Sequence, residues 1–256
     1  MGSRLADPRQ LFSSKVADYT TGRPDYPVAL FDELAALSVA TADTQIADVG
    51  AGTGLFTQSL LNRGWNVVAV EPNDAMRAAA DAALSKYPHY RSVSGDAENT
   101  TLKDQSIDLV TAAQAFHWFD VNRTRREFLR ILKPRGQVAL VWNDRVLSDP
   151  LQSELDEVFT EFSGNKRSVV QAHENRASVA EFFGAGDICK FTYPHEQRLD
   201  RERLIQRMLS RSYMPDRNTP EGRRVQEVVA RLFQRFMSDG FVTVRYKTVA
   251  TIGRPA

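Results

Sequence analysis

The feature that most constrains the fold is a glycine-rich segment at residues 48–54, with the sequence Asp-Val-Gly-Ala-Gly-Thr-Gly. The apolar run at 45–49 predicts a short β-strand, and the pattern at 54–63 predicts a helix. Glycine at Gly50 and Gly52 lets the chain turn tightly and brings backbone N–H groups close to a ligand, because no Cβ stands in the way. A strand, a glycine-rich turn and a helix in this order favour an α/β protein that binds a ligand at the turn.

Strand-like runs alternate with helical patterns from residue 44 to residue 143. Further strands are predicted at 65–71, 90–94, 106–112 and 137–142, and further helices at 74–87 and 123–132. A Lys-Pro-Arg-Gly turn at 133–136 is expected to introduce the last of these strands. Such alternation means βαβ units and a parallel sheet covered by helices. Right-handed crossovers then place the glycine-rich turn at the crevice where open sheets bind ligands.

The pattern changes after residue 143. Helices are predicted at 149–162, 201–211 and 221–238, and strands at 188–199 and 241–252. Pro194 indicates that the strand at 188–199 is an edge strand or carries a bulge. We therefore predict an α/β fold, in which a Rossmann-like, mostly parallel seven-stranded sheet has helices on both faces. A helical cap is inserted before the last strand.

One of these helices carries a pronounced apolar stripe. Its members are Val225, Val228, Val229, Leu232 and Phe236. Their spacing is that of an amphipathic helix with one buried face. We expect this face to pack as part of the cap, with a dimer seam as the alternative, so the protein is expected to be a monomer or a homodimer.

The charge balance and cysteine content exclude several classes of protein. Lys and Arg number 33 against 32 for Asp and Glu, a net charge of +1, which argues against a nucleic-acid partner. The single cysteine, Cys189, excludes an internal disulfide and a multi-cysteine zinc site. We interpret it as a small buried filler. There is no apolar run of about 18 residues and no secretory signal, so a cytoplasmic protein without a membrane partner is expected.

Two acidic residues follow the next predicted strands. Glu71 lies 17 residues after Gly54, where a carboxylate can accept hydrogen bonds from ribose hydroxyls; its alternative role is a solvated strand end. Asp96 is placed to accept from an adenine amino group, although alone it would be an ordinary turn residue. A dinucleotide fingerprint would require glycine where Leu55 stands, which disfavours an NAD-dependent reductase. The Lys-Ser/Thr of a nucleotide-phosphate loop is also absent after the glycines.

Four segments in chain order resemble the motifs of class I S-adenosylmethionine-dependent methyltransferases of the type 11 group. They are 48–54, 70–72 (Val-Glu-Pro), 95–98 (Gly-Asp-Ala-Glu) and 132–136 (Leu-Lys-Pro-Arg-Gly). These motifs cover about the first 145 residues. Arg135 departs from the pattern, because the family usually has a second glycine there.

A narrower likeness concerns three other segments. Residues 19–27, 114–119 and 210–213 resemble the subgroup that includes trans-aconitate methyltransferases. That subgroup suggests a small acidic acceptor. On this resemblance we expect residues 1–256 to form a single methyltransferase domain. Its parts are an N-terminal lid at 1–42, a cofactor-binding core at 43–145, and C-terminal strands with the cap at 146–256.

The resemblance implies that S-adenosylmethionine binds as cofactor and leaves as S-adenosylhomocysteine. The residues implied to bind it are Tyr19, Arg23, Asp48, Gly50, Ala51, Gly52, Glu71, Pro72, Asp96, Ala97 and Gln114. In this assignment the glycine loop holds the methionine part and Asp48 supports the loop. Glu71 binds the ribose, Asp96 and the Ala97 backbone bind adenine, and Gln114 marks the wall beside the sulfonium. Tyr19 and Arg23 lie in the segment that folds over the cofactor.

Candidate acceptor residues come from the subgroup-like segments. His117 is the candidate catalytic base, with a structural role beside Trp118 as the alternative. Trp118, with Phe116 and Phe119, is suited either to an apolar pocket wall or to the core. Arg211 and Tyr213, with Arg23, are candidates to hold a substrate carboxylate, since a guanidinium matches it bidentately. The remaining histidines lack ligand spacing, and no metal is expected.

The leading hypothesis is methyl transfer to a small-molecule acceptor, with a carboxylate oxygen as the preferred atom. A carboxylate is ionised at neutral pH and needs no base, whereas a phenol, amine or acidic carbon does. One alternative is therefore C- or N-methylation of a larger aromatic metabolite, with His117 as base. Another is a module that binds the cofactor without turnover.

Overall fold

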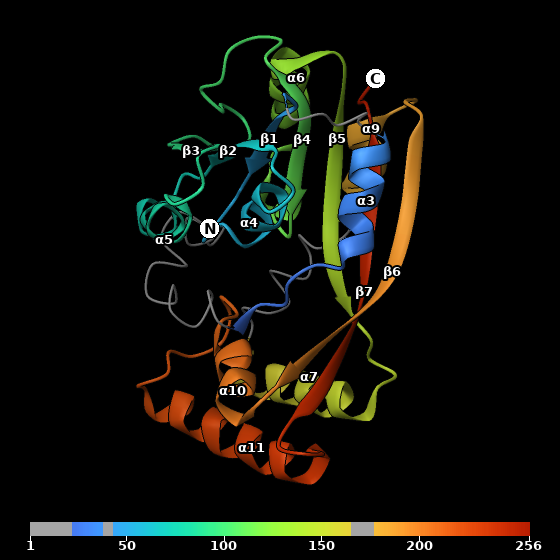
Figure 1. Ribbon diagram of the computed structural model, residues 1–256. Helices are drawn as coiled ribbons and strands as arrows, with labels where there is room; N and C mark the ends of the chain where they lie inside the picture. The colour runs from blue at the N-terminus through green and yellow to red at the C-terminus, as the bar shows by residue number, and fades with distance from the viewer. Residues whose placement is uncertain (1–21, 38–42, 165–176) are drawn as a thin grey trace, which may run out of the picture. The chain divides into compact units, whose positions relative to one another are not determined.

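The computed structural model describes residues 22–37, 43–164 and 177–256. Within these residues, seven strands form one sheet in the order β3-β2-β1-β4-β5-β7-β6 (Figure 1). The strands are β1 (Gln45–Val49), β2 (Asn66–Val70), β3 (Tyr90–Val93), β4 (Ile107–Ala113), β5 (Leu132–Arg145), β6 (Ile188–Leu199) and β7 (Val242–Gly253). The pairs β3–β2, β2–β1, β1–β4 and β4–β5 are all parallel. The predicted α/β fold with a mostly parallel seven-stranded sheet is therefore confirmed.

Helices connect the strands as the alternating pattern predicts. They are α3 (Val28–Leu37), α4 (Leu55–Leu61), α5 (Asp74–Leu84), the short 3₁₀-helix η2 (Phe116–Trp118), α6 (Val121–Ile131), α7 (Pro150–Ser163), α9 (Ala177–Phe183), α10 (Arg201–Leu209) and α11 (Pro220–Phe236). The last two lie between β6 and β7, which is where the inserted helical cap was predicted. In the part of the chain that the structure describes, no helix combines the length and apolarity needed to cross a bilayer.

The centre of the sheet is the place where the strand order reverses. From β1 the chain continues to β2 and β3 on one side, and it then returns to β4 and β5 on the other. Open parallel sheets bind their ligands outside the carboxyl ends of the strands at such a reversal. The glycine loop follows β1 and Gln114 follows β4, so the topology places both at this point.

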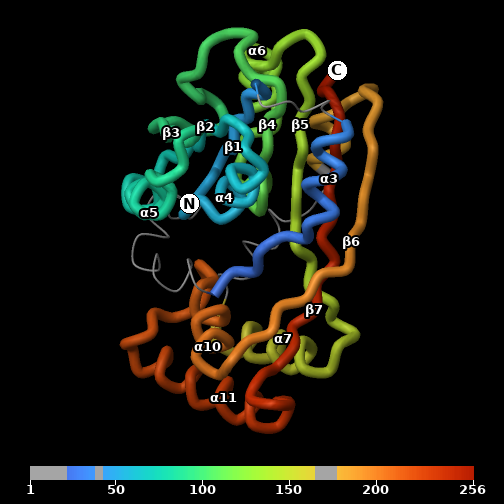
Figure 2. The backbone as a smooth tube through the Cα atoms, viewed as in Figure 1, coloured from blue at the N-terminus to red at the C-terminus, as the bar shows by residue number. Residues whose placement is uncertain are grey.

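The described chain forms two compact units. The core unit comprises residues 26–37, 43–143, 177–193 and 248–256, and the cap unit comprises 22–25, 144–164 and 194–247. Strands β5, β6 and β7 contribute residues to both units, and Figure 2 follows each of these strands as an unbroken backbone. The single-domain organisation stays a prediction. Residues 28–37 of the expected N-terminal lid form α3, which belongs to the core unit.

Alternate side chains of β1 serve two separate apolar layers of the core unit. Ile46 packs in a cluster with Leu60 of α4, whereas Ala47 packs in a second cluster with Phe128 of α6 and Phe182 of α9. All five side chains are buried. Complete burial of a Leu, Ile or Phe side chain contributes roughly 1.5–3 kcal/mol. Helices therefore cover both faces of the sheet, and β1 is fixed between them.

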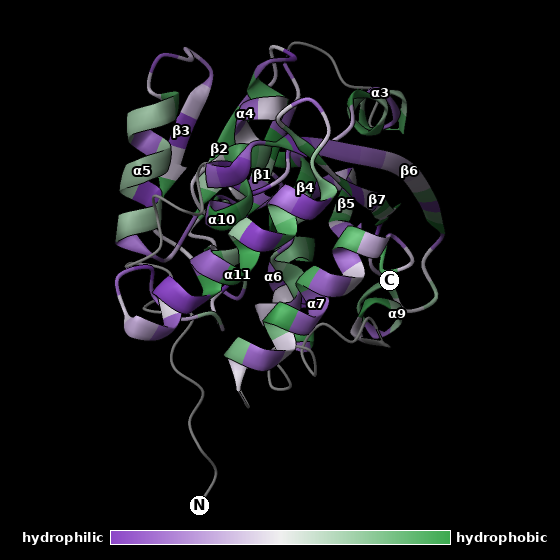
Figure 3. Cartoon of the chain, turned by 90° about the horizontal axis from the view of Figure 1, so that it is seen from below, coloured by the Kyte–Doolittle hydropathy of each residue, from purple (hydrophilic) through white to green (hydrophobic). Residues whose placement is uncertain are grey.

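The cap unit has an apolar cluster of its own, built from α7, α10, α11 and the first half of β7. Figure 3 shows α11 with hydrophobic and hydrophilic segments alternating along it. Val225, Val229 and Leu232 of the predicted stripe are buried in this cluster, and Val228 and Phe236 are partly buried against it. The stripe thus packs within the cap unit, as the first of the two interpretations proposed.

The edge strand β6 confirms one prediction and corrects another. Pro194 lies on β6 at the edge of the sheet, where the missing N–H of proline is tolerated. Cys189 lies on the same strand and is exposed. Its interpretation as a buried filler is therefore wrong, because the first residues of an edge strand have solvent where a central strand has neighbours.

The predicted turn at 133–136 is absorbed into β5. The strand begins at Leu132, directly after α6, and the register shifts between Ile107, opposite Leu132, and Leu109, opposite Gln137. The segment is thus an irregularity within the strand and not a turn before it. Its carbonyl groups find a different donor, because Arg254 donates to Lys133 O at 2.9 Å and to Gly136 O at 2.8 Å.

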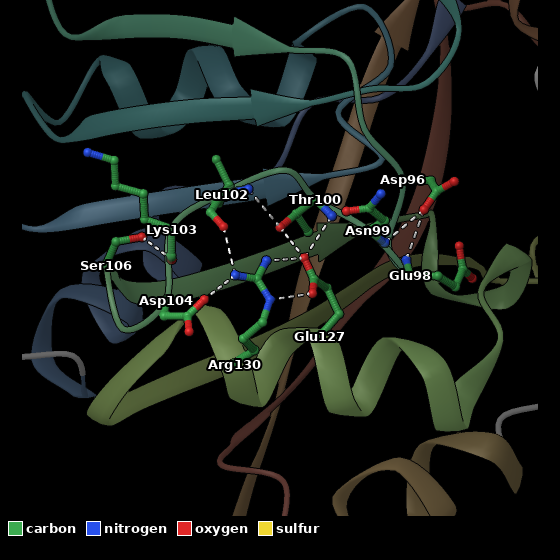
Figure 4. A network of polar contacts seen from close by, with 10 residues as sticks. All are labelled: Asp96, Glu98, Asn99, Thr100, Leu102, Lys103, Asp104, Ser106, Glu127 and Arg130. Carbon is green, nitrogen blue, oxygen red and sulfur yellow. Dashed lines mark hydrogen bonds and ion pairs between the residues drawn. The ribbon is translucent and has the colours of Figure 1, made fainter.

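A buried carboxylate ties α6 to the loop that follows β3 (Figure 4). Glu127 Oε1 accepts from the Thr100 N–H at 2.8 Å and from Thr100 Oγ1 at 2.5 Å. Arg130 donates to both carboxylate oxygens of Glu127, and it also donates to Leu102 O at 2.8 Å. Burial disfavours the charge of Glu127, but the bonds from Arg130 and Thr100 outweigh burial and hold its pKa below the ordinary value.

Replacing Glu127 by alanine is expected to lower the free energy of unfolding by about 2–4 kcal/mol, because the buried Thr100 N–H and hydroxyl lose their acceptor and Arg130 loses one of its acceptors. Urea denaturation at pH 7 measures the change. Arg126→Ala, at an exposed position one residue away on α6, serves as the control and should change stability by less than about 0.5 kcal/mol. Equal stability of the two variants would show that this carboxylate does not hold the loop.

Candidate functional site

The loop after β1 adopts a conformation that depends on glycine. Gly50 has a φ of +72°, in the left-handed region that other residues rarely adopt. A Cβ at Gly50 would stand 2.6 Å from the Cβ of Ala115, which follows β4, so the two segments approach more closely than side chains allow. The N–H groups of Gly50 and Ala51 both donate to Val70 O, at 2.9 and 3.3 Å. The loop is thereby folded onto the end of β2.

Asp48 lies beneath this loop and is 1% exposed. Its carboxylate accepts from Thr57 Oγ1 on α4 at 2.6 Å and from Thr111 Oγ1 on β4 at 2.8 Å. Burial raises the pKa of Asp48 to about 6, although both threonine bonds act in the opposite direction. The side chain therefore joins β1, β4 and the helix after the loop. Such contacts suit the supporting role that was predicted for it.

Glu71 joins the loop to the end of β2. The Gly52 N–H donates to Glu71 Oε2 at 2.8 Å, and the Asn73 N–H donates to Oε1 at 2.8 Å. The residue is 8% exposed, and burial raises its pKa against the effect of these two bonds. Each carboxylate oxygen has two acceptor positions, so each retains one for a further donor such as a ribose hydroxyl. Pro72, which follows, is half-buried.

The loop after β3 holds the two residues predicted to bind adenine. Asp96 Oδ1 accepts from the N–H groups of Glu98 at 3.2 Å and Asn99 at 2.9 Å, as Figure 4 shows. This is the local pattern of a turn aspartate. Ala97 is 2% exposed and belongs to the apolar cluster beside Phe128. The adenine role of both residues stays a prediction.

Gln114 follows β4 and has a strained backbone. Its φ is +56°, which costs a residue with a Cβ roughly 1–2 kcal/mol. Two hydrogen bonds to β5 hold this conformation. The Gln114 N–H donates to Val141 O at 2.8 Å, and the side-chain Nε2 donates to Asn143 O at 3.3 Å. Strain of this kind concentrates at functional sites. Thr101, Gln105 and Asp239 also have a positive φ, and the role of Gln114 beside the cofactor stays a prediction.

The aromatic residues that follow Gln114 differ in how deeply they are buried. Phe116 is 2% exposed and contacts Phe182 with ring centroids 5.0 Å apart, so it is part of the core. His117 and Trp118 are half-buried, and their ring centroids lie 5.1 Å apart. Phe119 is also half-buried, with its ring near the position of a Cβ on Gly50. The base and pocket roles of His117 and Trp118 stay predictions.

Three of the remaining candidates, Arg23, Arg211 and Tyr213, belong to the cap unit. Arg23 donates from a terminal guanidinium nitrogen to Ser210 O at 3.4 Å, which brings it to the residue that precedes Arg211. The guanidinium of Arg211 and the ring of Tyr213 both contact Phe159, with separations of 5.9 and 5.7 Å. Tyr213 is 7% exposed. The other candidate, Tyr19, lies outside the described residues.

Several residues that position the site were not predicted. Thr111 is buried among apolar residues of β4, and this signal identifies it as a partner for a buried polar group. Asn143 Oδ1 accepts from Thr248 Oγ1 at 2.6 Å, and this bond links β5 to β7 beside the carbonyl that Gln114 contacts. The partners of Asn143 are distant from it along the chain, so no local sequence pattern indicates these contacts.

The chain resembles known proteins over this region. Residues 47–140 match a family model described as a methyltransferase domain. A methyltransferase-like protein of Schizosaccharomyces pombe, itself uncharacterized, is 28% identical over 243 residues, which cover 93% of each chain. The malonyl-[acyl-carrier protein] O-methyltransferase of Pectobacterium atrosepticum is 31% identical over 138 residues. That match spans 54% of this chain and about half of that enzyme (52%).

A solved structure shows the same fold. A protein assigned as a type II methyltransferase from Anaeromyxobacter dehalogenans superposes with a TM-score of 0.60 at 24% identity, covering 90% of this chain and 96% of that one. The likeness to this structure shows the fold alone. The family match over residues 47–140 and the curated methyltransferase relatives support an S-adenosylmethionine-dependent methyltransferase.

The buried carboxylate of Asp48 gives the site a measurable pH dependence. Its native pKa of about 6 lies above the ordinary 3.8, so the native state binds the proton more tightly than the unfolded chain does. The stabilisation is fully present below the ordinary pKa and is lost as the pH rises through 6. Between pH 7.5 and pH 5, the free energy of unfolding of the wild type should therefore rise by about 1.4 kcal/mol relative to Asp48→Asn. Urea titrations of both proteins test this, and parallel pH profiles would contradict it.

Proposed function

We propose that this enzyme methylates a small molecule and that the acceptor atom is a carboxylate oxygen. The observation that carries the methyl-transfer part is the glycine loop held against Glu71 at the strand-order reversal. The resemblance of residues 19–27, 114–119 and 210–213 to the trans-aconitate methyltransferase subgroup supports a small acidic acceptor.

The residues of the core unit fit a nucleoside ligand. Gly50 and Gly52 leave backbone surface uncovered by side chains, and Glu71 retains acceptor positions for ribose hydroxyls. Asp96 and Ala97 would face the adenine, and Gln114 would border the methionine part. When bound, S-adenosylmethionine supplies a methyl group on a sulfonium sulfur. That sulfur keeps the electron pair of the broken C–S bond while the acceptor oxygen forms the new O–C bond.

The carboxylate acceptor is supported by two observations. The first is the bond from Arg23 to Ser210 O, which places one arginine of the subgroup-like segments beside the backbone of the residue that precedes another, Arg211. A guanidinium matches a carboxylate bidentately. The second observation is the name of the Pectobacterium relative, an O-methyltransferase that acts on a malonyl group. Arg23, Arg211 and Tyr213 would therefore orient the acid.

A carboxylate acceptor limits what the remaining residues need to do. The acid is already ionised at neutral pH, so no general base is required, and the protein's main task is to align the reacting atoms and exclude water. In this proposal His117 and Trp118 shape the wall of the site. A second candidate, methylation of an aromatic metabolite, is favoured by one observation, the half-buried pair of His117 and Trp118 rings. There His117 would accept the acceptor proton.

Incubation with methyl-labelled S-adenosylmethionine and a panel of small carboxylic acids, including trans-aconitate, tests this function. We expect transfer to at least one acid, with label that base treatment releases as methanol, because esters hydrolyse in base. The pH–rate profiles of the wild type and His117→Asn should have the same shape, because a carboxylic acid is already ionised above about pH 5 and needs no base. A reaction without acceptor corrects for hydrolysis of the cofactor.

Two outcomes would contradict the carboxylate assignment. One is base-stable label on an aromatic acceptor together with a rate that rises near pH 6.5, the ordinary pKa of histidine, and is lost in His117→Asn. The other is no transfer to any acid by a protein that binds the cofactor.

A further inference from the structure

The loop after β3 folds into a tight turn at residues 95–100. The N–H of Asp96 donates to Asn99 O at 3.2 Å, and the N–H of Asn99 donates to Asp96 O at 3.3 Å. A Cβ on Gly95 would stand 2.9 Å from Thr100 O, so the two ends of the turn lie close together. Asp96 Oδ1 accepts from two N–H groups inside the turn. The direction of the Asp96 side chain therefore depends on the shape of the turn.

Helix α6 holds this turn at two points, and all of the residues involved belong to the core unit. The N–H of Asp120, at the start of α6, donates to Glu98 Oε1 at 2.8 Å. Further along the same helix, Glu127 Oε1 accepts from the Thr100 N–H at 2.8 Å and from the Thr100 hydroxyl at 2.5 Å. Glu98 and Thr100 lie in the second half of the turn. Helix α6 therefore fixes the segment whose N–H groups bind Asp96.

Glu127 makes the buried contact of the two. It is 7% exposed, and Thr100 is fully buried. A buried donor that loses its acceptor is costly, so the bonds to Glu127 resist any opening of the turn. Arg130 donates to both carboxylate oxygens of Glu127, which fixes the orientation of the carboxylate (Figure 4).

We propose that Glu127 is a positioning residue for recognition of the adenine of the cofactor. It acts through Thr100 and the turn, which set where the Asp96 carboxylate and the Ala97 backbone lie. A site rejects a ligand that lacks one hydrogen-bond donor only when its acceptor is held in place and would be left unpaired. The inference rests on the proposed function, in which Asp96 and Ala97 face the adenine. Loosening the turn should therefore weaken recognition of the adenine amino group more than binding of the rest of the cofactor.

Calorimetric titration of the full chain with S-adenosylhomocysteine and with S-inosylhomocysteine tests this role. The second ligand carries a carbonyl oxygen in place of the adenine amino group, so it cannot donate to Asp96 from that position. The wild type should prefer the adenine ligand by about tenfold or more, as expected for a hydrogen bond to a charged acceptor. In Glu127→Ala this preference should fall by at least about threefold, because the turn no longer holds Asp96 in place.

Two further variants distinguish positioning from a structural role. Glu127→Gln keeps an oxygen that can accept from Thr100, so it should retain most of the preference for the adenine ligand. The double variant Asp96→Ala with Glu127→Ala should show the same preference as Asp96→Ala alone, since Glu127 acts through Asp96. Thermal melting shows which variants are folded. If Glu127→Ala is unfolded, Thr100→Val takes its place, because it removes the hydroxyl bond to Glu127 at nearly the same side-chain volume.

Asp104→Asn is the matched control. Asp104 pairs with the same Arg130 at 2.5 Å, and its side chain is 76% exposed. The substitution disturbs this arginine without removing an acceptor from the turn. The affinities for both ligands should remain unchanged.

The outcomes separate this inference from the proposed function. An undiminished preference in a folded Glu127→Ala, or in Thr100→Val where it takes its place, would overturn the positioning role, as would an equal loss in Asp104→Asn; methyl transfer would be unaffected. A wild type that binds both ligands equally would also overturn it, because the turn then does not recognise the amino group. Binding of neither ligand would overturn the cofactor assignment and the positioning role together. Loss of the preference in Glu127→Ala, with no transfer to any carboxylic acid, would keep the role and remove the carboxylate acceptor.

Discussion

The backbone N–H of Gly52 donates to the carboxylate of Glu71, and this bond joins the ends of two neighbouring strands into one surface. Asp48 also holds the loop in place, because its hydrogen bonds with two threonines connect β1 to β4 and to α4. Both carboxylates are buried, so their hydrogen bonds form in surroundings that screen little and are costly to leave unmade. The loop is consequently held in one conformation before any ligand arrives, which reduces the ordering that binding requires.

Part of the backbone strain of the core unit lies in the same region. Gly50 adopts a positive φ without strain because it has no Cβ, whereas the positive φ of Gln114 is strained because Gln114 has one. Two hydrogen bonds to β5 hold Gln114 there, and Ala115 then reaches Gly50. The close contact of these two segments explains why the loop after β1 and the turn after β4 depend on each other. A change in one is expected to move the other.

The elements that depend on local pattern could be predicted from the sequence. β1 and β6 have the predicted bounds, and the glycine loop lies where a strand is followed by a helix. Predictions failed where a distant partner decides the structure. The segment at 133–136 has turn residues, yet Arg254 binds its carbonyls and it lies within β5. Likewise, no local signal shows that Arg145 and Arg211 meet at Phe159, because the three come from different elements. Local pattern could therefore predict the strands and the glycine loop, but it could not predict contacts between residues that are distant along the chain.

The central claim is that the loop at Gly50 binds the cofactor, and its most direct test is calorimetric titration with S-adenosylhomocysteine. The wild type should bind one equivalent, and Gly50→Ala should bind at least about tenfold more weakly, because the new Cβ would meet Ala115 and the φ of +72° is strained. Gly64→Ala is the matched control: its φ is +77°, with nothing within 4 Å of a new Cβ. Strong binding by the wild type and Gly64→Ala, with weak binding by a folded Gly50→Ala, supports the account. No binding by the wild type, or equal affinity in all three proteins, would contradict it.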